Sequence, residues 1–430
     1  MPSFEDHPLR YALSNELHAR PFPSLQTPCR AVFLAIKQPQ DAAARDRDAD
    51  RAHLIELLDR HGTAHPQPGA THYSGRIGQN ELRWEQHTEF VTYTAILPGL
   101  GARPFDPADF GVFPEDWLAR IPGTRISSAM IRIVPRHDKS QIVQSLNDWF
   151  VLESLAASSV LDDAMTVAAD FHIDPAGHTR FAIFVAEDTG ARRIGRIMQR
   201  LCEIEAYKTL SMLGFSKMRE VSPRMGEIDG DLTRLMDEMA RQDEPDERTL
   251  AKLLKVSAEL EHLSAQTAFR RGATAAYEAL VIERIRVMRE ARFDGRQTFV
   301  EFMMRRYDPA MRTVKSAEKR LEAMSARAMR ASDLLRTRVE VQRSAQNQQL
   351  LESMDRRADL QLQLQKTVEG LSVVAISYYA VSLVSYLLYP VTDWTGLSKG
   401  WVMALVTVPV VALVWLMIRR IHHKVDRSRH

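Results

Sequence analysis

Two uncharged apolar stretches near the C-terminus decide the architecture of the chain: LSVVAISYYAVSLVSYLLY at 371–389 and WVMALVTVPVVALVWLMI at 401–418. Each is close to the roughly 20 apolar residues that a helix needs to cross about 30 Å of hydrocarbon. The linker PVTDWTGLSKG at 390–400 is typical of a turn in water. We therefore expect a transmembrane hairpin over residues 368–419. The alternative is a hairpin buried in a soluble core, but no other segment is apolar enough to surround it.

The charges that flank the two spans predict their orientation. Arg356, Arg357 and Lys366 precede the first span, and a basic tail at 420–430 follows the second. The linker holds only Lys399, offset by one Asp. The positive-inside rule therefore places both termini on the cytoplasmic side. We expect a multi-pass membrane protein with the lipid bilayer as its first partner.

The composition of the whole chain excludes a multi-span transporter, because 26% of its 430 residues are charged. The formal net charge is only +2. Such a balance gives no global field that would attract nucleic acid, so we expect no specific nucleic-acid partner. The two cysteines, Cys29 and Cys202, have no CxxC partner and cannot build a disulfide framework, which indicates a reducing cytoplasm.

Alternating strand and helix patterns predict a mixed α/β domain over residues 1–245. Runs of β-branched and aromatic residues indicate strands, and the turn residues at 78–80 and 175–177 indicate two hairpins. Capping residues and apolar spacing indicate two helices. The predicted strands are Arg30–Lys37, a hairpin within Thr71–Leu97, Arg125–Val134, Met165–Asp174 and Thr179–Ala186, and the predicted helices are Asp41–His61 and Ser140–Leu161.

Helices alone are predicted after residue 187. An amphipathic helix at Arg192–Leu213 precedes Pro223 and Gly226, which we expect to interrupt it before a second helix at Ile228–Arg241. The charged, proline-containing stretch Gln242–Arg248 looks like a linker, and it marks the expected domain boundary.

Long polar helices at Thr249–Glu290 and Ala310–Thr367 form a predicted stalk over residues 246–367. Its apolar seam has the 3,4,3,4 spacing of a coiled coil, and packed antiparallel helices are the alternative. Its many arginines favour either a solvated surface laced with ion pairs or contact with anionic lipid. The fold class is thus α+β: a mixed α/β domain, a helical or coiled-coil stalk and a transmembrane hairpin. The seam residues are Leu321, Met324, Ala328, Ala331 and Leu335.

Gly370, between the stalk and the first span, is a hinge candidate, with a plain packing residue as the alternative. The first span carries more hydroxyl groups than anchoring requires. Hydroxylated residues let membrane helices pack closely and form hydrogen bonds. We therefore expect helix packing within the hairpin or between subunits of a homo-oligomer, with a polar pore lining as the alternative. The predicted packing residues are Ser372, Ser377, Tyr379, Ser382, Ser385 and Tyr386.

A first candidate ligand-binding group lies near the N-terminus and consists of Asn15, Glu16, His18 and Arg20. Glu16 would orient the imidazole of His18, while Arg20 would hold an anion. Helix capping and a surface ion pair are the simpler interpretation of the same residues.

A second candidate group, Glu85, His87 and Glu89, would share one face of a strand by period-two alternation. Three such groups in a row would suit a divalent metal, whereas a solvated strand face is the simpler interpretation. The chain has no P-loop, GxGxxG, HExxH or GxSxG motif. We therefore assign no catalytic residue, no metal and no cofactor.

Four stretches of the sequence carry a resemblance to a known family. They begin at Asn15, His65, Gly195 and Leu334 and read NELHARPFPSLQTPCRAVFLAIK, HPQPGATHYSGRIGQNELRWEQHTEFVTYT, GRIMQRLCEIEAYKTLSMLGF and LLRTRVEVQRSAQNQQLLESMDRRADLQLQLQKTVEGLSVVAISYYAV. These stretches resemble the bacterial family known as domain of unknown function 3422. The resemblance implies a protein anchored in the bacterial inner membrane. It brings no activity and no catalytic residues to carry over.

More loosely, the predicted layout is similar to that of CorA-type divalent-cation channels. The Gly-Met-Asn filter expected after the first span is absent, and Tyr389-Pro390-Val391-Thr392 stands there instead. Three hypotheses follow. The favoured one is a non-enzymatic, membrane-anchored scaffold or regulator, and the others are a CorA-like channel and a membrane-tethered enzyme.

Overall fold

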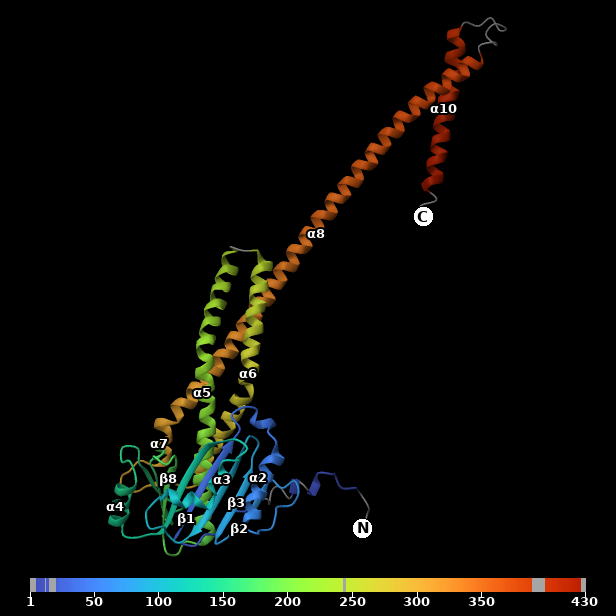
Figure 1. The fold of residues 1–430 in the computed structure, drawn as a ribbon. Coiled ribbons are helices and arrows are strands. Elements are labelled where there is room, and N and C mark those ends of the chain that lie inside the picture. Colours follow the sequence, from blue (N-terminus) through green and yellow to red (C-terminus); the bar gives the residue numbers. More distant parts are fainter. Residues whose placement is uncertain (1–4, 12, 15–20, 243–244, 389–398, 427–430) are drawn as a thin grey trace. The chain divides into compact units, whose positions relative to one another are not determined.

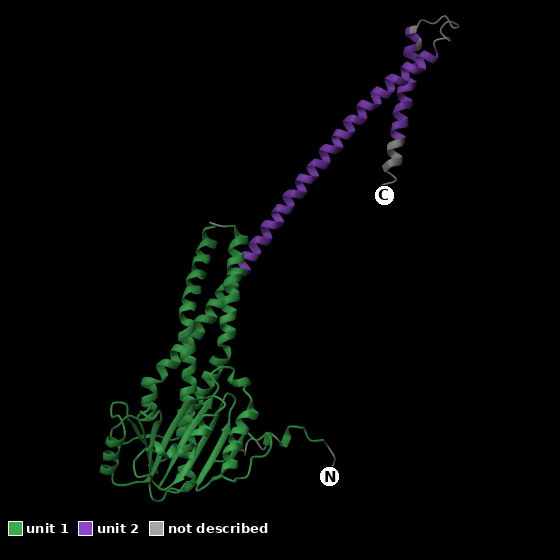
Figure 2. Cartoon of the chain, in the orientation of Figure 1, with its two compact units in different colours: residues 1–332 green, residues 333–430 purple. Residues whose placement is uncertain are grey.

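The computed structural model describes residues 5–11, 13–14, 21–242, 245–388 and 399–426. Its internal contacts divide the chain into two compact units, residues 1–332 and residues 333–430 (Figure 2). The architecture is α+β, as the sequence predicts. Unit 1 contains all the strands described below, and unit 2 contains the two apolar stretches.

A nine-stranded sheet is the centre of unit 1 in the described part of the chain (Figure 1). Its spatial order is β2-β3-β4-β1-β5-β8-β7-β6-β9. The hairpin turns predicted at 78–80 and 175–177 are confirmed, since they join β2 to β3 and β7 to β8. The strands are β1 Cys29–Lys37, β2 His72–Ile77, β3 Asn80–Gln86, β4 Phe90–Pro98, β5 Thr124–Pro135, β6 Ala156–Val160, β7 Met165–Ala169, β8 Thr179–Val185 and β9 Ala291–Arg292.

The sheet consists of two halves that meet at the antiparallel pair β1–β5. In each half a long strand is followed by a helix and then by a meander of three strands. The halves differ in direction, because β1 pairs antiparallel with β4 whereas β5 pairs parallel with β8. Nearly every residue of β1, β6 and β7 is buried, so both faces of the sheet are covered.

Short helices cover one face of the sheet. Helix α2, Arg47–Arg60, begins at Asp46, whose carboxylate accepts hydrogen bonds from two backbone N–H groups of its first turn. It packs with α3, Glu115–Leu118, on a core that includes Trp84 and Trp117. Helix α4, Lys139–Trp149, packs on the second half. The 3₁₀ turns η1 and η2 span Ala42–Ala44 and Pro107–Val112.

The predicted helix at Ser140–Leu161 is therefore wrong in its second part. Helix α4 ends at Trp149, and residues 156–160 form strand β6 between β7 and β9. A short apolar run does not distinguish a strand from a buried helix by periodicity. Small side chains in AASSV allow the close packing of β6, in which all five residues are buried.

Two long helices cover the other face of the sheet and extend beyond it (Figure 1). Helix α5, Ala191–Arg241, packs against β5 and β8, and helix α6, Asp246–Arg286, runs back along α5. The predicted interruption at Pro223 and Gly226 is wrong, because α5 continues through both. Proline removes one helical hydrogen bond, but the buried neighbours Val221 and Met225 support the helix on both sides.

Helices α7, Phe299–Arg306, and α8, Asp308–Leu387, follow after β9. In unit 1 the start of α8 lies beside α5 and α6, where Arg327 pairs with Asp229 and Arg271 pairs with Glu318. All five predicted seam residues are buried, and all but Leu335 belong to unit 1. In unit 1 the helices therefore pack against one another, which is the alternative given above to a coiled coil. The domain boundary expected at residue 245 falls between α5 and α6, which pack against each other.

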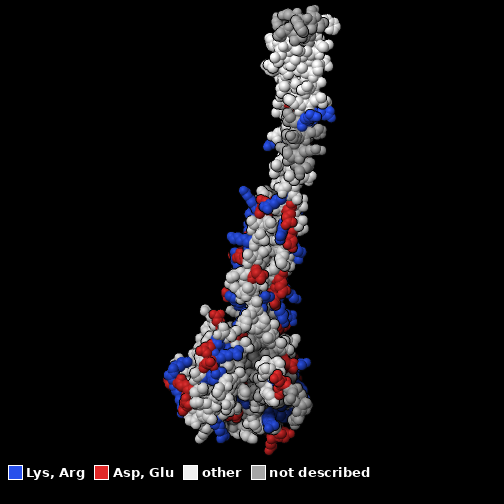
Figure 3. All heavy atoms as spheres, turned by 90° about the vertical axis from the view of Figure 1, so that its right-hand side faces the viewer, with Lys and Arg blue, Asp and Glu red and all other residues white. Residues whose placement is uncertain are grey.

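Unit 2 contains the rest of α8 and helix α10, Lys399–Asp426. By length and composition both helices could span a membrane. Only 11% of the apolar window of α8 and 6% of Met403–Arg420 in α10 are buried. Residues 371–388 and 400–418 contain no Asp, Glu, Lys or Arg, and Figure 3 shows a white surface there, bordered by charged side chains. These windows are therefore not core helices of the described chain.

The contact between α5 and α6 predicts opposite effects of alanine at two glycines of α5. A Cβ atom at Gly214 would lie 2.9 Å from both Cβ and Cγ2 of Thr274 on α6, so rotation of Thr274 gives no relief. A Cβ atom at Gly226 would meet nothing within 4 Å. We expect Gly214→Ala to cost about 1–3 kcal/mol of unfolding free energy through overpacking. Gly226→Ala should instead stabilise by about 0.5–1 kcal/mol.

Urea unfolding of the full chain in detergent, followed by tryptophan fluorescence, measures both effects. A Gly214→Ala chain at least as stable as the Gly226→Ala chain would contradict the close contact between the two helices.

Candidate functional site at the β3–β4 turn

The N-terminal candidate group, Asn15, Glu16, His18 and Arg20, lies outside the described residues. The description resumes at Pro21, whose carbonyl oxygen accepts a 2.6 Å hydrogen bond from Arg83 Nη2 on β3. The proposed roles of the four residues stay predictions.

The alternation predicted that the second candidate group, Glu85, His87 and Glu89, shares one strand face. The structure does not have this arrangement. Strand β3 ends at Gln86 and β4 begins at Phe90, so residues 87–89 form the turn between them. Glu85 and His87 stay close, with 3.8 Å between Glu85 Oε2 and His87 Nε2. Glu89 has no exposed surface and binds different partners. The three side chains thus lie in two separate environments, Glu85 and His87 in one and Glu89 in the other.

A buried arginine fixes the backbone of this turn from below. The guanidinium of Arg45 donates to the carbonyl oxygens of His87 at 2.7 Å, Thr88 at 2.5 Å and Phe90 at 3.1 Å. Its Nε donates to Asp50 at 2.8 Å, and this pair is almost completely buried. These charge-assisted hydrogen bonds to three carbonyl oxygens hold the turn in one conformation.

The same β3–β4 turn holds Glu89 against helix α6. Arg270 of α6 donates two hydrogen bonds to the Glu89 carboxylate, at 3.0 and 2.6 Å, and Lys37 Nζ lies 3.7 Å away. Burial would raise the pKa of Glu89, but the hydrogen bonds from Arg270 and Tyr277, with the two positive charges, outweigh burial and lower it. Burial also lowers the pKa of Lys37. The carboxylate is therefore ionised and fully engaged.

Aromatic rings complete the junction between the sheet and the two long helices. The rings of His87 and Phe90 stack with centroids 4.1 Å apart. Tyr207 of α5 and Tyr277 of α6 stack at 5.5 Å, and both meet Phe90 edge-on. The β3–β4 turn therefore touches α5 and α6 at once, through rings and through charge.

The cavity beside this junction is small. It lies between the sheet and α5, against Glu85, His87, Cys202 and Tyr207, and its volume is about 30 Å³. A space of that size holds about two water molecules, since one needs roughly 10–15 Å³. An organic substrate does not fit. In the described part of the chain no group of three or more His, Cys, Asp or Glu residues could hold a metal ion.

Both cysteines are buried and free. Burial raises the pKa of the Cys202 thiol well above its usual range and that of Cys29 to about 12. Neither thiol ionises near neutral pH, so neither has the thiolate character of a nucleophile.

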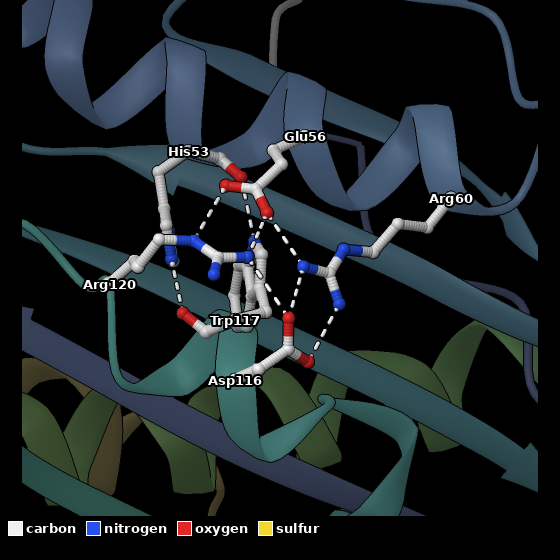
Figure 4. A network of polar contacts seen from close by, with 6 residues as sticks. All are labelled: His53, Glu56, Arg60, Asp116, Trp117 and Arg120. Atoms are coloured by element: carbon white, nitrogen blue, oxygen red, sulfur yellow. Dashed lines mark hydrogen bonds and ion pairs between the residues drawn. The ribbon is translucent and has the colours of Figure 1, made fainter.

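A second polar network lies on the opposite face of the sheet, where α2 meets α3 (Figure 4). Arg60 donates to both carboxylate oxygens of Asp116, at 2.9 and 2.6 Å, and to Glu56 at 2.7 Å. Arg120 also donates to Glu56 and Asp116. The guanidinium groups hold the pKa values of both carboxyls below their usual range. The network is exposed, so each pair stabilises the fold only weakly.

Beneath this network, the ring of His53 stacks on Trp117 with centroids 3.9 Å apart. His53 Nε2 lies 3.1 Å from the carbonyl oxygen of Trp117, which only accepts, so Nε2 carries the proton. Nδ1 then accepts from the Tyr93 hydroxyl at 3.0 Å. Burial lowers the pKa of His53. The neutral ring is therefore part of the core.

The membrane-packing residues predicted in the first span lie at different depths in unit 2. Ser377 is buried, Ser382 and Ser385 are half-buried, and Ser372, Tyr379 and Tyr386 are exposed. Val381 of α8 and Val414 of α10 are also buried. Gly370 is exposed within α8. The hinge role stays a prediction, as does the filter hypothesis, because residues 389–392 lie outside the described residues.

Comparison with protein families adds one finding. The profile of the family described as "Protein of unknown function (DUF3422)" matches residues 5–425. The chain belongs to this family. The resemblance to DUF3422 that four stretches of this chain carry is thereby confirmed. The likeness to CorA channels is not shown. No curated protein matches the chain.

Sequence reasoning missed the residues that hold the junction of this DUF3422 protein together. Lys37 lies on β1, Arg45 follows η1, and Arg270 and Tyr277 lie on α6, so no local motif marks the set. The signal that existed was indirect: Glu89 directly precedes the apolar and aromatic strand that begins at Phe90, where a charge requires a partner.

The buried pair of Glu89 and Arg270 predicts a large loss of stability when either partner is removed. Glu89→Gln and Arg270→Met should each lower the unfolding free energy by about 3–5 kcal/mol, because the remaining charge stays buried without its partner. The double variant should recover part of that loss. Urea unfolding in detergent gives the coupling energy by a double-mutant cycle.

Arg271→Met is the matched control, since the adjacent Arg271 pairs with the part-exposed Glu318. We expect it to cost at most about 1 kcal/mol. Equal costs at positions 270 and 271 would contradict the special role of Arg270.

The buried neutral imidazole of His53 predicts a loss of stability in mild acid. Its pKa is lower in the folded chain than the ordinary value of 6.5, so the unfolded chain binds the proton first. Stability is fully present above pH 6.5 and falls as the pH drops below it, by at most about 1.4 kcal/mol per pH unit.

The unfolding free energies of the wild-type and His53→Gln chains at pH 7.5 and 5.5 test this. We expect the wild-type chain to lose more stability between the two pH values than the variant, which cannot titrate at this position. Identical losses would show that His53 does not contribute.

Proposed function

We propose that this protein is a membrane-anchored scaffold or regulator of the bacterial inner membrane, which presents unit 1 to partners in the cytoplasm. The observation that carries the proposal is the exposure of two helical windows long and apolar enough to cross a bilayer. Such surface is not stable in water, and a membrane is the solvent that covers it.

The candidate chemistry in unit 1 supports a non-enzymatic role. Glu89 is neutralised by Arg270 and Lys37, and the cavity against His87 and Tyr207 has a volume of only about 30 Å³. Groups that act on a substrate are directed into a space that admits it. Here the polar groups bind one another and join the sheet to α5 and α6. Their chemistry is that of a structural junction.

The arrangement of unit 1 gives a route by which a bound partner would act. The sheet holds α6 through Glu89 and Arg270, and α6 in turn binds α8 through Arg271 and Glu318. Helix α8 then continues without a break to Leu387, within its apolar window. A shift of the β3–β4 turn would strain each of these contacts, so we propose a regulator rather than a passive anchor.

The arginine-rich helices contribute to this packing. Arg270, Arg271, Arg284 and Arg327 each pair with a carboxylate on another element. These ion pairs account for four of the arginines without contact with anionic lipid. We retain lipid contact in the proposal only for residues that flank the two spans.

Reporter fusions test the anchoring and its orientation. A reporter fused after Leu388 would follow one span and should be active outside the cytoplasm, whereas a reporter fused after His430 should be active inside. The chain should stay with the membrane after alkaline extraction and need detergent for release. A chain that is monodisperse without detergent, or an extracytoplasmic reporter after His430, would overturn the proposal.

A further inference from the structure

We propose that residues 347–371 of α8 form a contact face for a second copy of this chain, with the two helices parallel and in register. The inference rests on the membrane anchoring proposed above and names a partner for it. The face is defined by the positions that repeat with alternating spacings of three and four residues through this segment.

Helix α8 has no cover over this part of its length in the described residues. Leu335 and Val339 are its last buried positions before the segment, and every residue from 340 to 368 is exposed. Leu350, Met354 and Leu364 have 60%, 58% and 70% of their surface exposed. An amphipathic helix is stable only when its apolar stripe is buried against another element.

Five of the eight large apolar residues exposed in this segment follow one line along the helix, while Leu351 and Leu360 flank that line and Leu362 lies outside it. Leu350, Met354, Leu364, Val368 and Leu371 all occupy seam positions of a single heptad frame. The seam has three polar positions in this segment, Asn347, Arg357 and Gln361. Such residues fix the register of paired helices at some cost in stability. Continued along α8, the heptad frame of the buried seam at Leu321–Leu335 falls on Glu352, Asp359 and Lys366. The exposed apolar line therefore lies on a different face of α8 from the buried seam.

Charge in this segment is kept away from the seam. In the same heptad frame the side positions next to the seam hold Leu, Ala, Ser, Thr and Gln. The other charged residues all fall on the three outer positions: Glu352, Asp355, Arg356, Asp359, Lys366 and Glu369. Two copies of this face can meet with Arg357 as the one like-charged pair. A partner recognised by charge would require charges here to pair with.

The anchoring determines the direction in which copies meet. Residues 347–371 lead into the apolar window of the same helix, with no helix break between them. Two chains inserted in one membrane therefore present α8 in the same direction, and the depth of insertion places equal residues at equal heights. These constraints favour a parallel, in-register contact between identical chains.

Cysteine cross-linking in membranes tests the contact. Native Cys29 and Cys202 are only 3% and 4% exposed, so single substitutions report introduced thiols. In the full-length chain, Leu364→Cys on the seam should form disulfide-linked dimers under mild oxidation. Asp359→Cys and Lys366→Cys, on the outer positions, should give at least about fivefold less disulfide-linked dimer, because a disulfide requires Cα atoms within roughly 7 Å.

A second pair of substitutions tests the contact face by charge, at positions other than the one that carries the introduced cysteine. Added to Leu364→Cys, Leu350→Lys should reduce the dimer because it places like charges opposite each other, while Glu352→Lys on an outer position should leave it unchanged. Both positions are exposed in the single chain, so folding of unit 1 is unaffected.

The outcomes separate this inference from the proposed function. Membrane-bound chains with equal cross-linking at positions 359 and 364, with none at 364, or with cross-links to a different protein would overturn the contact between copies while the anchoring stands. Release of the chain by alkaline extraction would overturn the anchoring and with it the parallel contact.

Discussion

The fold of unit 1 depends on how one fully buried carboxylate is neutralised. Glu89 lies at the end of the sheet where α5 and α6 cross it, and Arg270, Lys37 and Tyr277 converge on it. A buried charge without partners would cost several kcal/mol. The turn that carries it is therefore fixed by Arg45 on one side and by α6 on the other. This interaction sets the position of the helical pair on the sheet.

Much of the fold could be predicted from sequence because its signals are local. The two hairpins follow from turn residues, and the long α8 follows from the lack of a breaker between residues 310 and 387. The errors occurred where tertiary contacts override local preference. Residues 156–160 form a strand because β7 and β9 flank them, and α5 passes through Pro223 because buried neighbours hold it.

The candidate site could be located from sequence but its chemistry could not. Glu85, His87 and Glu89 were identified as unusual, and they do lie at the junction. Their roles depend on Arg45 and Arg270, which are separated from Glu89 by 44 and 181 residues. Ordinary helix patterns contain such arginines at many positions. Only the pairing of the sheet with α6 shows which one meets the carboxylate.

The smallest strand of the sheet has a consequence for how the chain reaches its native state. Strand β9 is only two residues long and pairs with β6, and the nearby contact of Ser158 with Glu290 joins residues 132 positions apart. Until α6 has formed and brought β9 back, the outer side of β6 offers unpaired backbone groups to any other chain. Such distant closure is slow, so this margin is where aggregation of newly made chains would begin.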